Sequence, residues 1–333
     1  MPELLRSVHS DSLVRLGSER EDVVVLSADL TSSTEAETFK LAYPDRFFSM
    51  GMAEQNMMSV AGGMAREGLV PLVHDFAVFM YRRALDQIEM SIAYPNLPVK
   101  MLGFLPGIAT PGGVSHQAIN DLAVMTALPN VSVLECADAR DVQSVLDVAC
   151  AIDGPVYVRM LRGSLPRLFE APMRFRRGRL LSSTGRDVVL LSSGVCTADG
   201  MDATSQLMDS GVGIAHIGVS TLSPFDDQQV LDAVSEARLG VITVENHLVT
   251  GGLGTATATL MAERGLATRL VRLGLRSYGR GGSQHYLQSQ YGIDTKAIVH
   301  AIADMAGLNV ESELCPSTEP TVAEDRAGPD EAL

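Results

Sequence analysis

Residues 46–57 read Arg46-Phe47-Phe48-Ser49-Met50-Gly51-Met52-Ala53-Glu54-Gln55-Asn56-Met57, the most informative stretch of the chain. A short apolar run is followed by a glycine turn and by a predicted helix that begins near Glu54. Apolar residues recur after Glu54 at helical spacing, at Met57, Met58, Val60, Ala61 and Met64. Most helical glutamates face water, but no other charge lies in the turn of Glu54. A buried carboxylate is costly without a specific partner, so we interpret Glu54 as functional.

The first half of the chain alternates strands and helices. Apolar runs predict buried parallel strands at 23–27, 47–50, 69–73, 99–104, 131–135 and 156–160. Further helices are predicted over 79–93 and 120–128. A second set of such units begins at residue 187. The pattern predicts an α/β protein with two doubly wound, mostly parallel sheets.

The domain boundaries follow from shifts in composition. We expect a first domain at 1–165 and a second at 187–308. The linker between them, 166–186, contains prolines and the basic cluster Arg174-Phe175-Arg176-Arg177. Residues 309–333 are rich in Pro, Glu, Asp and Ala, which predicts a disordered acidic tail.

The composition excludes several classes of protein. Among 333 residues, 46% are hydrophobic and 20% are charged, which suits a globular protein with a sizeable core. A net charge of −14 argues against nucleic-acid binding. The cysteines are widely spaced and predict neither a metal site nor a disulfide framework: Cys136, Cys150, Cys196 and Cys315. Without a signal core or a membrane-length apolar run, the expected location is the cytoplasm, with no membrane partner.

The segment Gly51-Met52-Ala53-Glu54-Gln55-Asn56-Met57 resembles the one that carries the catalytic glutamate of transketolases and 1-deoxyxylulose-5-phosphate synthases. These enzymes use thiamine diphosphate. The resemblance implies that Glu54 bonds the aminopyrimidine N1′ and favours the imino tautomer, which deprotonates thiazolium C2. It extends to the second half, where Glu245-Asn246-His247 and Gly251-Gly252-Leu253-Gly254 are similar to transketolase C-terminal domains. It therefore implies a pyrimidine-binding domain followed by a transketolase C-terminal-like domain.

The same resemblance assigns further residues to the cofactor. Phe76 and Phe79 would by themselves be interpreted as core, but the family's Phe-x-x-Phe pair lines the aminopyrimidine pocket, and Phe79 corresponds to the stacking ring. Arg82 stands where the family often has tyrosine, and we include it in the pocket. Asp29, in Ser27-Ala28-Asp29-Leu30-Thr31, corresponds to a residue near the thiazolium side, although by itself it is equally typical of a helix N-cap.

Substrate contacts are implied for Ser33, His116, Gln117 and Arg162. Ser115-His116-Gln117 matches the family's Thr/Ser-His-Gln, whose histidine contacts a sugar hydroxyl or carbonyl oxygen, and we predict a catalytic role for His116. Ser33 is placed near the substrate phosphate. Arg162 follows a predicted strand where the family has a phosphate-binding arginine, and a guanidinium suits phosphate or sulfonate oxygens.

Two positions depart from the family pattern. Gly112 stands in place of an aspartate that contacts a substrate hydroxyl, and Phe104 replaces a histidine found in many transketolases. The departures indicate a changed donor or acceptor, smaller or less hydroxylated than a standard sugar phosphate.

The family's metal motif, Gly-Asp-Gly, occurs nowhere in the sequence, and the chain starts almost directly at the pyrimidine-binding domain. The resemblance is therefore to the C-terminal subunit of a split transketolase, which moves a two-carbon ketol unit from a phosphorylated ketose to an aldehyde. The expected partner is an N-terminal subunit that binds the diphosphate and its Mg²⁺. We expect an α2β2 assembly that acts on small sugars.

Two alternatives remain open. The first is another thiamine-dependent carboligase, related to deoxyxylulose-phosphate synthase and acting on pyruvate or a specialised sugar. The second is a non-catalytic paralogue that scaffolds an assembly. The joint presence of Glu54, Phe79, His116 and Arg162 disfavours the second.

Overall fold

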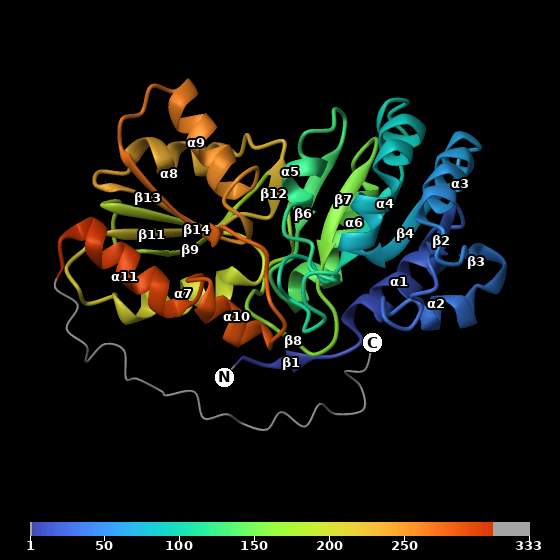
Figure 1. Cartoon of the computed structure of the whole chain (residues 1–333), viewed down its shortest axis with the longest axis horizontal. Coiled ribbons are helices and arrows are strands. Elements are labelled where there is room, and N and C mark those ends of the chain that lie inside the picture. The colour runs from blue at the N-terminus through green and yellow to red at the C-terminus, as the bar shows by residue number, and fades with distance from the viewer. Residues whose placement is uncertain (1, 309–333) are drawn as a thin grey trace.

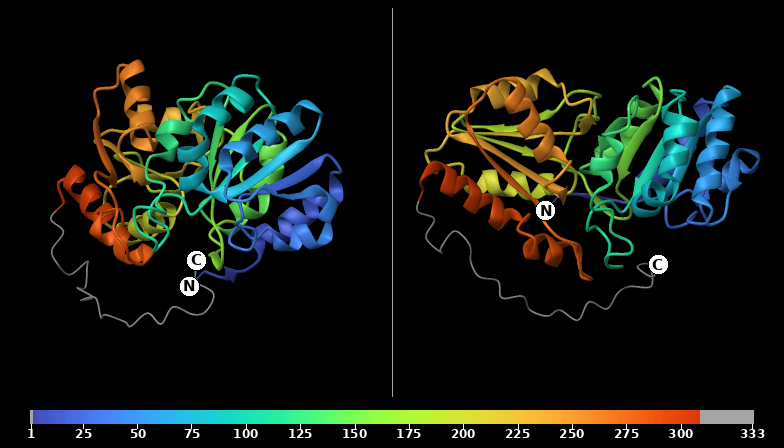
Figure 2. Two further views of the ribbon diagram at one scale, coloured as in Figure 1. Left: turned by 45° about the vertical axis from the view of Figure 1, so that its right-hand side comes forward. Right: turned by 45° about the horizontal axis from the view of Figure 1, so that its top comes forward.

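The computed structural model describes residues 2–308, which form two main β-sheets with helices packed against them (Figure 1). The predicted acidic tail, 309–333, lies outside the described residues. Helices cover both faces of each sheet, so the predicted fold class is confirmed (Figure 2). Within the described part of the chain, no helix is both long and apolar enough to cross a membrane.

The first sheet has the strand order β12-β6-β7-β5-β4-β2-β3. Its neighbours are parallel except β12, which runs antiparallel to β6. The bounds are β2 Val23–Ser27, β3 Phe47–Ser49, β4 Val70–Phe76, β5 Lys100–Phe104, β6 Ser132–Glu135, β7 Val156–Met160 and β12 Thr221–Ser223. β4 continues beyond the predicted end at residue 73, because residues 70–76 are all buried and pair with β2 and β5.

Helices α1, α2 and α6 pack together on one face of this sheet, and α3, α4 and α5 cover the other. Their bounds are α1 Val8–Glu19, α2 Glu37–Ala42, α3 Glu54–Arg66, α4 Ala77–Gln87, α5 Asp121–Met125 and α6 Ala139–Cys150, with the 3-10 turn η1 at Pro44–Arg46. The predicted helix 79–93 is α-helical only as far as Gln87 and continues as the π-helix η2, Ile88–Ala93. Ala84 interrupts α4 with non-helical backbone angles, φ −122° and ψ 20°.

The second sheet has the order β14-β13-β10-β11-β9. Its strands are β9 Arg179–Ser183, β10 Val188–Ser192, β11 Ile214–Gly218, β13 Gly240–Leu248 and β14 Arg269–Leu275. Its helices are α7 Cys196–Gln206, α8 Gln228–Glu236, α9 Leu253–Glu263, α10 Gln284–Gln290 and α11 Thr295–Ala306. β9 pairs antiparallel with β11, so the end of the segment predicted as a linker is an edge strand of this sheet.

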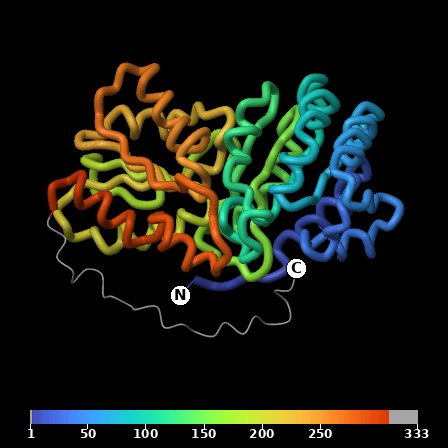
Figure 3. Tube along the Cα trace, viewed as in Figure 1, coloured from blue at the N-terminus to red at the C-terminus, as the bar shows by residue number. Residues whose placement is uncertain are grey.

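The two halves are joined by more than the connecting chain (Figure 3). β12 comes from the second half but completes the edge of the first sheet. Asn246, in β13, accepts from the Ile108 N–H (2.9 Å) and donates to the Pro106 carbonyl (3.2 Å). Beneath both, β1 Leu4–Leu5 pairs with β8 Leu165–Pro166. The hydrogen bonds of Asn246 hold the loop after β5 against the second half, whereas β1 and β8 both belong to the first half.

Candidate active site

The candidate residues lie around the carboxyl ends of the parallel strands of the first sheet. Phe76 is the last residue of β4, Arg162 follows β7 and Asp29 follows β2. Glu54 is the first residue of α3, which follows β3. Ligands of open α/β sheets bind at this edge because the connecting loops and helix N-termini face it.

Glu54 is buried, with a relative exposure of 3%. Gly51 makes the preceding turn with φ +69°, and Met57, Met58 and Ala61 anchor α3 in the core. The N-terminal end of a helix favours a carboxylate through its dipole and free N–H groups. The burial that the sequence predicts for Glu54 is therefore confirmed, and the local fold supports its charge.

Arg83 is the ion-pair partner of Glu54. Its Nη1 lies 2.5 Å from Glu54 Oε1, and its Cζ lies 4.2 Å from the ring centre of Phe79. The Arg83 side chain is 48% exposed, whereas that of Glu54 is 4% exposed. Sequence reasoning missed this residue, although Phe79 and Arg83 are four positions apart in a predicted helix and hence neighbours on its surface.

A second buried carboxyl group, Asp75, belongs to the same site. Its Oδ1 accepts from the Phe76 N–H (2.7 Å), and its Oδ2 has no hydrogen-bond partner among residues 2–308. Burial, reinforced by the charge of Glu54, raises the pKa of Asp75 to about 8. Asp75 is therefore largely protonated at neutral pH. Sequence reasoning missed it because β4 was expected to end at residue 73.

The aromatic residues lie together as the sequence suggests. The ring centres of Phe76 and Phe79 are 6.0 Å apart with a 30° tilt. Phe79 is half-buried, and the His116 ring meets it edge-on at 5.4 Å. Glu54, Phe79 and His116 are thus brought to one place. A carboxylate beside an aromatic face fits the nitrogen edge and the flat ring of an aminopyrimidine.

The loop that carries His116 is shaped by neighbouring glycines. A Cβ atom added at Gly112 would lie 3.0 Å from the Cβ and Cγ atoms of His116. His116 Nδ1 is 2.9 Å from Ser115 Oγ. Any side chain at position 112, including the family aspartate, would therefore press on His116 in its present position.

Gln117 and Arg82 point away from the pair of Glu54 and Phe79. Gln117 is buried, and its Nε2 donates to the Arg280 carbonyl of the second half (2.9 Å). Arg82 donates to Tyr81 Oη (2.9 Å) and to the Gln117 carbonyl (3.1 Å). The structure thus brings Arg83, rather than Arg82, to Glu54.

Arg162, Ser33 and Asp29 occupy the loops on the other side of Phe76. Arg162 Nη1 donates to the Ser33 carbonyl (2.9 Å), and its Cζ lies 5.9 Å from the Phe76 ring centre. Asp29 is exposed with φ 64°. It is not a helix N-cap, because α2 begins at Glu37 with Ala36 as its cap.

The site offers no obvious metal centre. Among residues 2–308, no group of three or more His, Cys, Asp or Glu side chains is placed to hold a metal ion. The residues fit the pyrimidine part of thiamine diphosphate but supply no carboxylate cluster for a diphosphate-bound cation.

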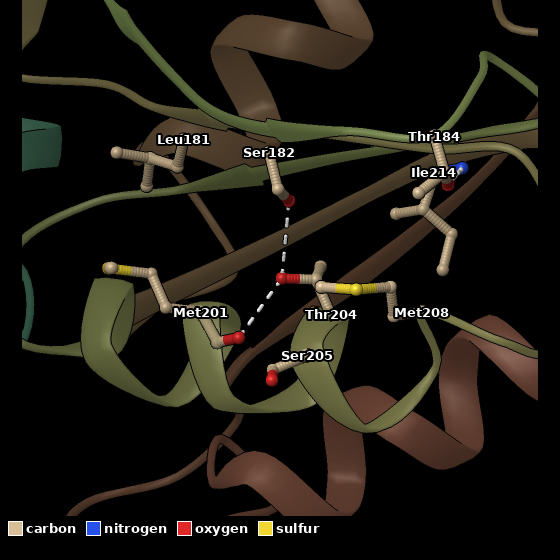
Figure 4. A pocket seen from close by; sticks show the side chains of 8 residues that line it. All are labelled: Leu181, Ser182, Thr184, Met201, Thr204, Ser205, Met208 and Ile214. Atoms are coloured by element: carbon tan, nitrogen blue, oxygen red, sulfur yellow. Dashed lines mark hydrogen bonds between the residues drawn. The ribbon is translucent and has the colours of Figure 1, made fainter.

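A separate pocket lies between β9 and α7 (Figure 4). Two of its hydroxyl groups are linked, since Ser182 Oγ donates to Thr204 Oγ1 (3.3 Å), which donates to the Met201 carbonyl (3.1 Å). The rest of its lining is largely apolar, including Leu181, Met208 and Ile214. It presents no charged group to orient a ligand.

Comparison with known proteins agrees with this geometry. Residues 4–167 match the transketolase pyrimidine-binding domain, and residues 177–298 match the transketolase C-terminal domain. An uncharacterized transketolase family protein of Sinorhizobium fredii is 40% identical over 298 residues, covering 88% of this chain and 86% of the relative. A 6-deoxy-6-sulfo-D-fructose transketolase subunit of a Clostridium species is 35% identical over 300 residues, covering 89% and 92%.

A solved structure gives the same result in three dimensions. A split-gene transketolase, determined as an inactive β4 tetramer, superposes with a TM-score of 0.81 at 35% identity. The match covers 93% of this chain and 100% of the other. Two domain matches, relatives along most of the chain and a buried glutamate beside an aromatic pair lead to one conclusion: the chain belongs to the transketolase family, whose members depend on thiamine diphosphate.

Proposed function

We propose that this chain is the C-terminal subunit of a split transketolase, which transfers a two-carbon ketol unit from a phosphorylated ketose to an aldehyde. One observation carries the proposal. Glu54 is a buried carboxylate at the start of α3, at the ligand-binding edge of the sheet, and Arg83 links it to the ring of Phe79. When bound, thiamine diphosphate supplies the acidic thiazolium C2–H and the ketol-transfer chemistry.

The roles of this chain's residues follow from their positions. Glu54 would hold a proton between its carboxylate and the aminopyrimidine N1′, and Phe79 would orient the flat ring by stacking, with Phe76 as the wall behind it. His116, edge-on to Phe79, would exchange a proton with a substrate oxygen. Asp29, two residues past the end of β2, would lie on the thiazolium side.

Arg162 and Ser33 are proposed to hold the charged end of the substrate. A guanidinium recognises phosphate or sulfonate oxygens by paired hydrogen bonds, so either anion suits this position. The relative named as a 6-deoxy-6-sulfo-D-fructose transketolase subunit supports a sugar that carries such an anion. Gly112, where an added Cβ would lie only 3.0 Å from His116, supports a substrate that lacks one of the usual hydroxyl contacts.

The metal is proposed to come from a partner subunit. The sequence lacks Gly-Asp-Gly, and the described residues hold no metal-binding cluster. We therefore propose a partner that binds Mg²⁺ and the diphosphate, in an α2β2 assembly. Calorimetry should show weak thiamine diphosphate binding by this chain alone, and tight, magnesium-dependent binding by the lone chain would refute the two-subunit arrangement.

The decisive experiment measures C2–H exchange of thiamine diphosphate in deuterated water by NMR, on the chain assembled with a Gly-Asp-Gly subunit. Glu54→Gln should reduce exchange by about 100-fold or more while the assembly persists. Glu67→Gln, at the exposed far end of α3, is the matched control and should leave exchange unchanged. Unchanged exchange in Glu54→Gln would refute the assigned role.

A donor and acceptor screen on the same assembly separates the alternatives. Ketol transfer between sugars supports transketolase activity, and product formation from pyruvate supports a carboligase related to deoxyxylulose-phosphate synthase. Turnover of no donor, with C2 exchange also absent, supports a scaffolding paralogue.

A further inference from the structure

The Arg83 guanidinium makes two contacts at once. It pairs with Glu54 Oε1 at 2.5 Å, and it lies over the Phe79 ring at 4.2 Å from Cζ to the ring centre. Its neighbour Arg82 makes neither contact, because its donors go to Tyr81 and Gln117. The arrangement is therefore specific to one side chain of α4.

These are the two contacts that the proposed function assigns to the cofactor's aminopyrimidine. A guanidinium and an aminopyrimidine are both flat, both present N–H groups in their plane and both stack on aromatic rings. A flat group that shares a hydrogen bond with Glu54, either as a donor or through a proton on the carboxyl group, and that stacks on Phe79 has little choice of position. Arg83 and the aminopyrimidine consequently compete for one place.

The surroundings explain why a cation lies there. Glu54 is almost completely buried, and Asp75, the buried carboxyl group beside it, is largely protonated at neutral pH, so Glu54 carries the negative charge that Arg83 meets. A buried carboxylate without a partner is strongly unfavourable, so Arg83 stabilises Glu54. The Arg83 side chain is half exposed, and helix α4 breaks at Ala84 directly after it. The guanidinium can thus leave toward solvent without disturbing the core.

We propose that Arg83 is a stand-in for the aminopyrimidine: it neutralises Glu54 and covers Phe79 until thiamine diphosphate displaces it. This inference rests on the proposed function. Displacement of an ion pair opposes cofactor binding, so the cost appears as a weaker cofactor affinity. Removal of Arg83 should therefore have two opposite effects. It should strengthen cofactor binding, and it should lower the stability of the chain that lacks cofactor.

The test uses the two-subunit assembly and Arg83→Met, which keeps the apolar length of the side chain and removes its charge. Isothermal titration with thiamine diphosphate at fixed Mg²⁺ should show Kd lowered by roughly 5–10-fold. Thermal unfolding without cofactor should show a lowered Tm. Arg66→Met, an exposed arginine at the end of α3, should change neither quantity. A double variant with Glu54→Gln should recover the Tm, because no buried charge is left unpaired.

Weaker or unchanged cofactor binding by Arg83→Met would overturn the inference, since Arg83 would then contact the bound cofactor or lie outside its place. If Arg83→Met does not assemble, Arg83→Lys serves instead. It keeps the charge but loses the planar stacking, and a smaller decrease in Kd is expected; an increase would overturn the inference. If the unmodified assembly does not bind thiamine diphosphate, both the proposed function and this inference are refuted. If the unmodified assembly binds the cofactor and exchanges C2–H normally, but Arg83→Met does not bind the cofactor more tightly, only this inference is refuted.

Discussion

Gly112 and His116 are in such close contact that even a single methyl group at position 112 would press on the His116 side chain, with 3.0 Å between the added Cβ and the Cβ and Cγ atoms of His116. Real Cβ atoms rarely approach other atoms this closely, so the histidine has to yield. The residue at 112 therefore helps to determine where the imidazole lies, and the family aspartate could not be restored here without consequence.

The first prediction is that Gly112→Asp lowers activity instead of restoring a missing contact. Displacement of His116 should reduce kcat/KM of the assembled enzyme by roughly 10–100-fold, because small misplacements of reacting groups are costly. Gly112→Ala should show a smaller loss in the same direction. Steady-state kinetics provide the measurement, with Pro111→Ala, exposed in the same loop, as the control. A gain in activity with Gly112→Asp would show that the loop accommodates the carboxylate.

The second prediction concerns pH and Asp75. The folded-state pKa of Asp75, about 8, lies above the ordinary value of 3.8. Between these values the folded chain binds a proton that the unfolded chain has released, so the free energy of unfolding decreases as pH rises from about 4 to 8. Asp75→Asn removes this ionisation and can keep the hydrogen bond from the Phe76 N–H.

The Asp75→Asn chain should therefore gain stability relative to the unmodified chain as pH rises, by about 1–3 kcal/mol between pH 5 and 8. Urea unfolding at several pH values provides the measurement. Asp45→Asn, an exposed aspartate in η1, should leave the pH profile unchanged. Parallel profiles for Asp75→Asn and the unmodified chain would contradict a buried, protonated Asp75.

The third prediction concerns the buried ion-pair network at the junction of the two halves. Arg159 is fully buried and pairs with Asp121 (2.8 Å) and Glu135 (2.5 Å). Its Nη2 also donates to the Asn246 carbonyl of the second half (3.0 Å). Among residues 2–308, Arg159 is the only cation that pairs with these two carboxylates, so its removal leaves two buried charges without an ion-pair partner there.

Arg159→Met should therefore destabilise the chain by about 3–5 kcal/mol in urea unfolding. Arg177→Met, at an exposed position, should change the free energy of unfolding by less than about 0.5 kcal/mol. A loss below about 1 kcal/mol for Arg159→Met would mean that water or a rearrangement replaces the guanidinium.

Local sequence patterns predicted much of the fold, because strands such as β2 and β10 are continuous apolar runs that are fully buried. The position of Glu54 was likewise predictable, since the glycine turn at Gly51 and the methionines of α3 are local signals. The pairing of β12 with β6 was not, because residues 221–223 and 132–135 are distant in sequence and nothing in either segment specifies the other.

The candidate site was predictable only where a single residue carries the signal. Phe79 and His116 were found by motif and do lie together. Arg83 looks like an ordinary surface arginine until α4 turns it toward Glu54. The burial of Asp75 could not be predicted from the local sequence, because it depends on the pairing of β4 with its neighbours β2 and β5. The orientation of Gln117 depends on the second half, to which it donates a hydrogen bond.

The return of β12 to the first sheet has a consequence for how the protein is made. Strand β6 is complete once residue 135 has been synthesised, but its outer edge has no partner until residues 221–223 leave the ribosome. An unpaired edge strand can recruit other chains. The nascent chain must therefore keep this edge from foreign strands while about 90 further residues are translated, at about 5–20 residues per second.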